Sequence, residues 1–164
     1  MTHWFKNDSL FIEQLKTGHA WQALPATYFQ LKGFDVEVPE LKIRDNVKQA
    51  KKFANTIDLI VQNLKFEVKS RTETFTSPES FQYPTILIDT VSGYNEKKEK
   101  PFAYIMVSQH TGSMLFLRSD QPDGWVIEKK FDTVRKIRDE FYLAPKAKWR
   151  PLDELVPLIK EYGK

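Results

Sequence analysis

Two short segments flanking Gln62-Asn63 restrict the fold of this chain more than any other feature. Residues 64–70 alternate apolar and polar side chains, and residues 57–61 have Ile57, Leu59 and Val61 at every second position, which is typical of strands with one buried face. Two such strands separated by two residues predict a β-hairpin. With Gln62-Asn63 as its turn, Leu59 lies opposite Phe66 and Asp58 lies opposite Glu67.

The predicted register separates apolar from charged side chains. The apolar face consists of Ile57, Leu59, Val61, Leu64, Phe66 and Val68. The opposite face carries Asp58, Glu67 and Lys69. Directly opposed residues have Cβ atoms roughly 4.5 to 5.5 Å apart, so the two carboxylates would repel unless a cation lay between them. Magnesium prefers oxygen ligands, and the pattern therefore predicts a Mg²⁺ site with Lys69 beside it.

A simpler interpretation remains open for the same residues. Glu67 and Lys69 are then the polar half of an ordinary amphipathic strand, and Asp58 is the first residue of its partner. The register is also an expectation, because Gln-Asn is not a favoured pair for a type I′ turn.

The size and composition of the chain predict a single domain over residues 1–164. With 164 residues and 41% hydrophobic content, the chain can bury a substantial core. It has no cysteine, which excludes disulfides and thiolate zinc sites. Its three histidines, His3, His19 and His110, are too scattered for a zinc site. The chain shows no secretory signal and no membrane span, so we expect a cytoplasmic protein.

The order of expected elements indicates an α/β domain with a central mixed β-sheet flanked by helices. Helices are predicted at residues 10–15, 19–31, from Asp132 onward and from about Pro151. Strands are predicted at residues 34–39, 57–61, 64–70 and 85–91, with a hairpin over 102–107 and 113–117. Pro25 should break the second helix unless it lies in a first turn. The core then spans about 8–117, followed by a C-terminal helical extension over about 131–164.

Asp58, followed on the next strand by Glu67-Val68-Lys69 and preceded by a helix and a strand, resembles the PD-(D/E)XK nuclease superfamily. The resemblance covers about residues 8–117 and implies a restriction-endonuclease-like fold. It implies an endonuclease that hydrolyses DNA phosphodiester bonds with Mg²⁺ or Mn²⁺ and a metal-activated water. Asp58 and Glu67 would be metal ligands, the Val68 carbonyl a further ligand, and Lys69 the catalytic lysine.

Many members of that superfamily also carry a glutamate on the first core helix. Here the corresponding residue is Gln22, with Glu13 as the alternative. An amide oxygen can coordinate a metal or its water, but a neutral ligand favours one ion over two. The candidate catalytic set is thus Asp58, Glu67, Lys69 and Gln22. The expected partner is duplex or branched DNA, and a homodimer is compatible with the resemblance.

Basic residues recur in three clusters that could bind a phosphate backbone. They are Lys97-Lys98-Lys100, Arg135-Lys136-Arg138 and Lys146-Lys148-Arg150. The net charge of +3 is too small to identify a nucleic-acid partner by itself. Asp89 is expected to be a turn residue at the end of a strand, with an outer acid near the site as the alternative. Gln109 or His110 could touch a phosphate. The alternative functions are a non-catalytic nucleic-acid-binding or assembly module that retains the fold, and a structural protein whose polar face is solvated.

Overall fold

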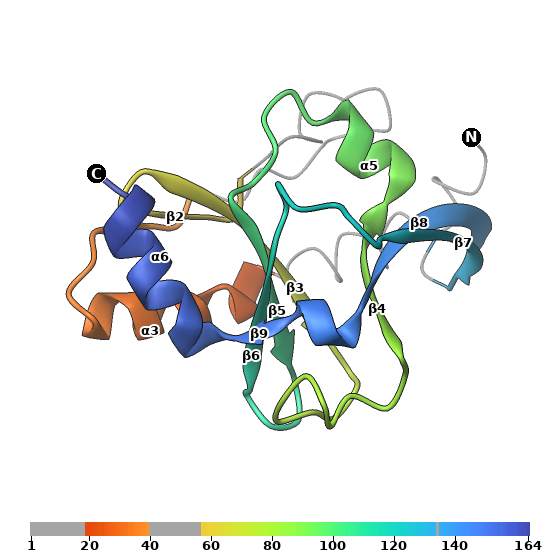
Figure 1. Cartoon of the computed structure of the whole chain (residues 1–164), viewed down its shortest axis with the longest axis horizontal. Helices are drawn as coiled ribbons and strands as arrows, with labels where there is room; N and C mark the ends of the chain where they lie inside the picture. Colours follow the sequence, from red (N-terminus) through yellow and green to blue (C-terminus); the bar gives the residue numbers. More distant parts are fainter. Residues whose placement is uncertain (1–18, 40–56, 134) are drawn as a thin grey trace.

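The structure, a computed structural model, describes residues 19–39, 57–133 and 135–164. Figure 1 shows how the elements are arranged along the chain. The helices are α3 (Ala23–Leu31), α5 (Val91–Glu96) and α6 (Leu155–Tyr162), with short 3₁₀ turns η2 (Lys146–Lys148) and η3 (Leu152–Glu154). The strands are β1 (Val36–Glu37), β2 (Leu59–Val61), β3 (Leu64–Arg71), β4 (Thr85–Thr90), β5 (Ala103–Ser108), β6 (Met114–Arg118), β7 (Val126–Asp132), β8 (Ile137–Pro145) and β9 (Arg150–Pro151).

The strands form two sheets. The larger has the order β1-β2-β3-β5-β6-β9, and the smaller has the order β4-β8-β7. Within the larger sheet β3 and β5 run parallel while the other neighbours are antiparallel. The predicted α/β class with a mixed sheet is therefore confirmed. The predicted strand at 85–91 exists as β4 but belongs to the smaller sheet.

The β2–β3 hairpin has the register predicted from its alternation. Leu59 pairs with Phe66 and Val61 pairs with Leu64. Gln62 and Asn63 have φ angles of 48° and 64°, the left-handed values that a type I′ turn requires at both central positions. The Gln62 side chain also connects the turn to the segment before β1, because its Oε1 accepts a 2.6 Å hydrogen bond from the Asp35 amide.

Within the described residues, the two faces of the larger sheet are covered differently. Helices α3 and α6 cover one face, where Phe29 and Ile159 belong to the same buried cluster as Phe66 and Val68. On the other face, strands β4 and β8 of the smaller sheet pack against Met106 of β5 in a second buried cluster. The reason lies in the alternation of β3 and β5, which gives the sheet an apolar surface on one side and a mixed one on the other.

Helix α3 is shorter than the predicted helix over 19–31. Residues 19–21 are helical, a turn intervenes at Gln22, and α3 begins at Ala23. Pro25 lies in the first turn of α3, where its missing N–H leaves no hydrogen bond unmade. Gly33, with a φ of 86°, follows the end of the helix as predicted. No helix within the described ranges has the length and apolar character needed to cross a membrane.

The predicted helix starting at Asp132 is wrong, because residues 126–145 form the β7–β8 hairpin. Ile137 and Phe141 do recur at a spacing of four, but with Leu143 they also share one face of a strand. The Asp132 side chain accepts a hydrogen bond from the Arg135 amide at 2.9 Å, and Lys136 adopts a φ of 60°. The residue taken for a helix cap therefore closes a turn. The extension over 131–164 is helical only in its last part, where α6 follows Pro151 as expected.

Several predictions lie outside the described residues. They concern the helix over 10–15, Glu13 and His3.

Candidate active site

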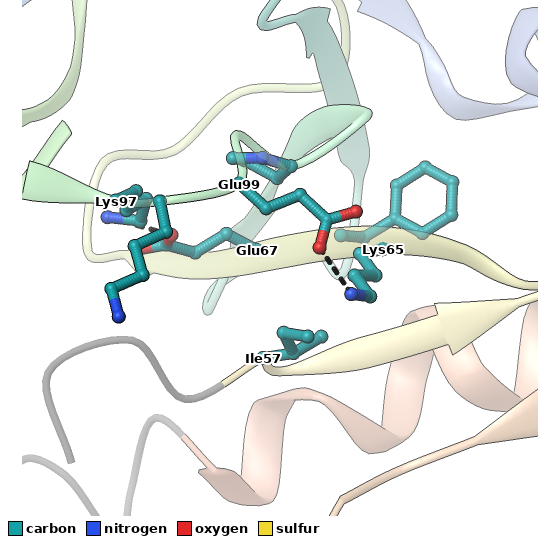
Figure 2. A pocket seen from close by; sticks show the side chains of 8 residues that line it. Ile57, Lys65, Glu67, Lys97 and Glu99 are labelled. Atoms are coloured by element: carbon teal, nitrogen blue, oxygen red, sulfur yellow. Dashed lines mark hydrogen bonds and ion pairs between the residues drawn. The ribbon is translucent and has the colours of Figure 1, made fainter. Parts of the chain in front are cut away.

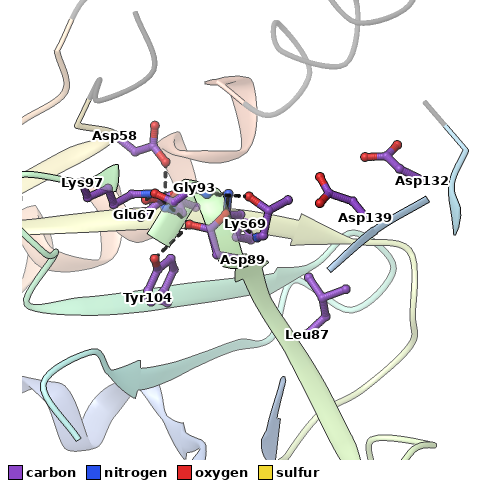
Figure 3. A network of polar contacts seen from close by, with 12 residues as sticks. Asp58, Glu67, Lys69, Leu87, Asp89, Gly93, Lys97, Tyr104, Asp132 and Asp139 are labelled. Atoms are coloured by element: carbon purple, nitrogen blue, oxygen red, sulfur yellow. Dashed lines mark hydrogen bonds and ion pairs between the residues drawn. The ribbon is translucent and has the colours of Figure 1, made fainter. Parts of the chain in front are cut away.

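A cluster of charged side chains lies on the face of the larger sheet that is turned toward β4 (Figure 3). Glu67 and Lys69 come from β3, and Tyr104, the strand partner of Glu67, comes from β5. Asp89 stands near the end of β4, and Lys97 follows α5 directly. The candidate residues thus gather where the two sheets meet.

Asp58 is fixed to the backbone of β3. Its Oδ2 accepts a 2.9 Å hydrogen bond from the Val68 amide, and its other oxygen accepts none from the described residues. Burial, and then the nearby negative charge of Glu67, raise the pKa of Asp58 to about 6. Asp58 precedes the paired residues of β2, but it lies close enough to Glu67 for the two carboxylates to repel each other.

Lys69 lies between two carboxylates. Its Nζ is 2.7 Å from Glu67 Oε1 and 3.8 Å from Asp89 Oδ1. Burial alone would lower the pKa of Lys69, but Glu67, Asp89 and Asp58 together outweigh it and raise the pKa above the usual lysine value. Lys69 consequently stays protonated at neutral pH. A protonated lysine at this position can stabilise negative charge.

Asp89 is part of the cluster, so its interpretation as a turn residue is wrong. Its Oδ2 lies 2.7 Å from Lys97 Nζ, which also contacts Glu67 Oε2 at 3.2 Å and the Gly93 carbonyl at 3.1 Å. Burial opposes ionisation of Asp89, but Lys69 and Lys97 hold its pKa below the ordinary range. Lys97 therefore bridges Asp89 and Glu67.

Tyr104 completes the network from beneath. Its hydroxyl donates a 2.9 Å hydrogen bond to Asp89 Oδ2, and its side chain is fully buried. Burial, followed by the charges of Glu67 and Asp89, raises the pKa of Tyr104, which keeps its proton in this bond. The sequence offered no signal for this role, since all six residues of β5 are buried and read as plain core.

A glycine allows the segment after β4 to approach Asp89 closely. A Cβ at Gly93 would lie 2.5 Å from Thr90 Oγ1 and 3.1 Å from Asp89 Oδ1. Thr90 uses that same oxygen to accept a 2.9 Å hydrogen bond from the Gly93 amide, which caps α5. The short helix and the position of Lys97 thus depend on the absence of a side chain at Gly93.

Gln22 is buried at 6% exposure, and its Oε1 has no hydrogen-bond partner among the described residues. None of the hydrogen bonds or ion pairs that hold the cluster together in the described ranges involves Gln22. Its contribution to the site remains a prediction. A buried amide oxygen without a donor does, however, require some further group to satisfy it.

The residues present fit one divalent cation better than two. Across residues 19–39, 57–133 and 135–164, no three carboxylate or imidazole side chains form a group suited to a metal. Magnesium often takes only one or two carboxylates and completes its shell with water and phosphate oxygens. Asp58 and Glu67 supply such a pair. The second oxygen of Asp58 accepts no hydrogen bond from the described residues, and a cation would relieve the repulsion that raises the pKa of Asp58.

The basic clusters contribute less free charge than the sequence indicated. Lys97 is used in the network, Lys100 donates to carbonyls at the end of α5, and Lys146 donates to the carbonyls of Glu79 and Phe81. Arg135 pairs with Asp132 and Asp139. Lys98 is exposed and forms no ion pair with the described residues. At the other candidate loop, Gln109 donates to Ser70 Oγ at 3.0 Å.

No protein-family profile matches the chain, and no curated protein matches its sequence.

Proposed function

We propose that the chain is a metal-dependent DNA phosphodiester hydrolase, an endonuclease of restriction-endonuclease-like architecture. One observation carries the proposal. Asp58 accepts a hydrogen bond from the amide of Val68, the residue between Glu67 and Lys69. Two carboxylates and a protonated lysine therefore lie close together. Paired carboxylates with a neighbouring lysine suit phosphodiester hydrolysis, in which negative charge develops on the phosphate.

Each residue of the site then has a distinct role. Asp58 and Glu67 hold Mg²⁺ or Mn²⁺, with the Val68 carbonyl as a further candidate ligand. The bound cation supplies Lewis acidity, which activates water and polarises the phosphate. Lys69, kept positive by its carboxylate neighbours, stabilises the charge that develops on the phosphoryl oxygens.

Three further residues orient the carboxylate of Glu67: Asp89, Lys97 and Tyr104. Tyr104 fixes Asp89, Asp89 fixes Lys97, and Lys97 contacts the Glu67 oxygen that Lys69 does not. A carboxylate held from two directions loses little further freedom when it binds a cation or substrate. These three are positioning residues.

The proposal is tested by incubating supercoiled, linear, single-stranded and branched DNA with the protein and Mg²⁺ or Mn²⁺. The test variants are Asp58→Asn, Glu67→Gln and Lys69→Met, and Asp123→Asn in the exposed segment 120–124 is the matched control. We expect cleavage by the wild type and the control and at least a hundredfold loss in the three variants. Undiminished cleavage by the folded variants would overturn the proposal.

A second candidate is a nucleic-acid-binding module without catalysis. It is favoured by the fact that both oxygens of Glu67 already contact lysines, at 2.7 and 3.2 Å. Such a module binds DNA equally well with Mg²⁺ or with a chelator and cuts none of the four DNA forms. Binding measured by fluorescence anisotropy in both conditions separates it from the nuclease.

A further inference from the structure

A pocket of about 200 Å³ opens directly beside Glu67. It lies between β3 and the segment that connects α5 to β5. The described residues that line it are Ile57, Lys65, Phe66, Glu67, Lys97, Lys98, Glu99 and Pro101. In Figure 2 Glu67 lies between Lys97 on one side and the Lys65–Glu99 pair on the other.

The lining combines an apolar interior with positive charge. Ile57, which is half-buried, and Pro101 supply apolar surface. Lys65 is neutralised by Glu99 at 2.5 Å, whereas Lys98 forms no ion pair with the described residues. An occupant should therefore have a flat or compact apolar part and an anionic group beside it.

The size of the pocket limits the occupant further. Sites for drug-sized ligands commonly measure about 300 to 1,000 Å³, so a volume of about 200 Å³ suits one ring system. Lys65, Glu67 and Lys69 alternate along one face of β3, and positions two residues apart are separated by roughly 6.5 Å. The pocket is thus one such step from Lys69.

We propose that this pocket takes up the unpaired base of a nucleotide whose phosphate lies at Glu67 and Lys69. The substrate is then single-stranded or branched DNA, because a base stacked and paired in duplex DNA cannot enter a pocket without first being extruded. This inference rests on the proposed function and specifies its substrate. Lys98 is placed to contact a neighbouring phosphate.

The first experiment measures binding in the presence of Mg²⁺ by calorimetry. The probes are inorganic phosphate, 2-deoxyribose 5-phosphate and thymidine 5′-monophosphate. We expect the nucleotide to bind at least fivefold more tightly than the sugar phosphate, which is the order of one stacked base. Equal affinity for the last two probes would overturn the inference.

Filling the pocket should remove only the contribution of the base. Ile57→Trp places a large side chain at the wall of the pocket, and Glu99→Trp does so from an exposed position that does not threaten folding. In both variants we expect the nucleotide to bind no better than the sugar phosphate. Phosphate affinity should be unchanged in Ile57→Trp and should not fall in Glu99→Trp, because the loss of Glu99 frees the positive charge of Lys65. Ile127→Trp on exposed β7 is the control and should keep the full preference. A preference that survives both pocket variants contradicts the inference.

A second measurement compares DNA forms. Single-stranded 12-mers should bind at least tenfold more tightly than a blunt hairpin duplex of the same length, and Glu99→Trp should remove most of that difference. A duplex bound as tightly as the single strand overturns the inference. Nucleotide binding that persists in a protein unable to cleave any DNA would instead refute the nuclease activity alone.

Discussion

The amide of Val68 donates a 2.9 Å hydrogen bond to the carboxylate of Asp58, ten residues earlier in the chain. The donor stands between Glu67 and Lys69, whose side chains project on the opposite face from that of Val68. Asp58 is therefore attached to the backbone of the strand that carries its two proposed partners. This bond, more than strand pairing, keeps the two carboxylates together, since β2 begins only at Leu59.

Replacing Asp58 by asparagine should separate stability from metal binding. The amide oxygen can still accept from Val68, and the variant removes a buried charge that Glu67 repels. At pH 8 and without metal we expect the free energy of unfolding to rise by roughly 1 to 3 kcal/mol. Mg²⁺ should no longer stabilise the protein. Urea denaturation with and without Mg²⁺ tests both effects, and the control variant Asp123→Asn should change neither.

The pH dependence of stability should report the same carboxyl group. Its pKa is raised from the ordinary 3.8 to about 6 in the folded state. A raised pKa means that the folded state binds the proton more tightly, so this stabilising contribution is complete below pH 4 and is lost as pH rises through 6. Metal-free wild type should therefore show a fall in stability over that window that Asp58→Asn lacks. Parallel curves for the two proteins would refute the assignment.

Binding of Mg²⁺ should follow the opposite trend, because the metal requires the ionised carboxylate. We expect the apparent affinity to be constant above about pH 7 and to fall about tenfold per pH unit well below pH 6. Calorimetric titration at several pH values measures this. An affinity independent of pH between 5 and 7 would exclude Asp58 as a ligand.

Removing the hydroxyl of Tyr104 should weaken the network without opening a cavity. Tyr104→Phe leaves Asp89 without one donor inside the protein, which should cost roughly 1 to 3 kcal/mol. The pKa of Asp89 should rise, since a bond that favours its ionised form is lost. Thermal unfolding and carboxyl NMR titration report the two changes. Tyr83→Phe, at an exposed tyrosine, is the matched control and should be neutral.

Replacing Gly93 by alanine should destabilise α5 and displace Lys97, although Gly93 is not itself one of the charged residues of the site. The added Cβ would meet Thr90 Oγ1 at 2.5 Å, so the cap of α5 must move, and Lys97 at the end of that helix must move with it. We expect a loss of roughly 1 to 3 kcal/mol. Ser92→Ala, at an exposed neighbour on α5, should have little effect. Chemical denaturation of the two variants gives the comparison.

The parts of the fold that were predictable are those governed by local pattern. Alternation around Gln62-Asn63 determined the β2–β3 register because a shift of one residue would turn Phe66 toward solvent. The turn itself is stabilised by a contact with Asp35 that local propensity cannot indicate. At residues 132–141 the spacing of apolar residues led to a wrong prediction. Residues four positions apart share a face in a helix, but they also share a face in a strand. Pairing of β8 with β4 and β7 decided in favour of the strand.

Half of the candidate site was predictable for a related reason. Asp58, Glu67 and Lys69 lie within one hairpin, so sequence spacing indicates their proximity. Asp89, Lys97 and Tyr104 come from three other elements, and a polar strand end, a lysine-rich loop and a buried tyrosine are each ordinary alone. Their association follows from the packing of one sheet on the other, which pairwise spacing along the chain does not encode.

The β2–β3 turn is also hydrogen-bonded to a residue that lies about one hundred positions later in the chain. Lys164 donates its amide to the Gln62 carbonyl at 2.9 Å and accepts from Asn63 Nδ2 at 3.2 Å. The segment that follows α6 thereby helps to hold the two strands of the hairpin in register. If these hydrogen bonds broke and the strands slipped by one position, Asp58 would exchange faces with its apolar neighbours. Loss of the Lys164 hydrogen bonds would then disable the proposed metal site without changing any residue within it.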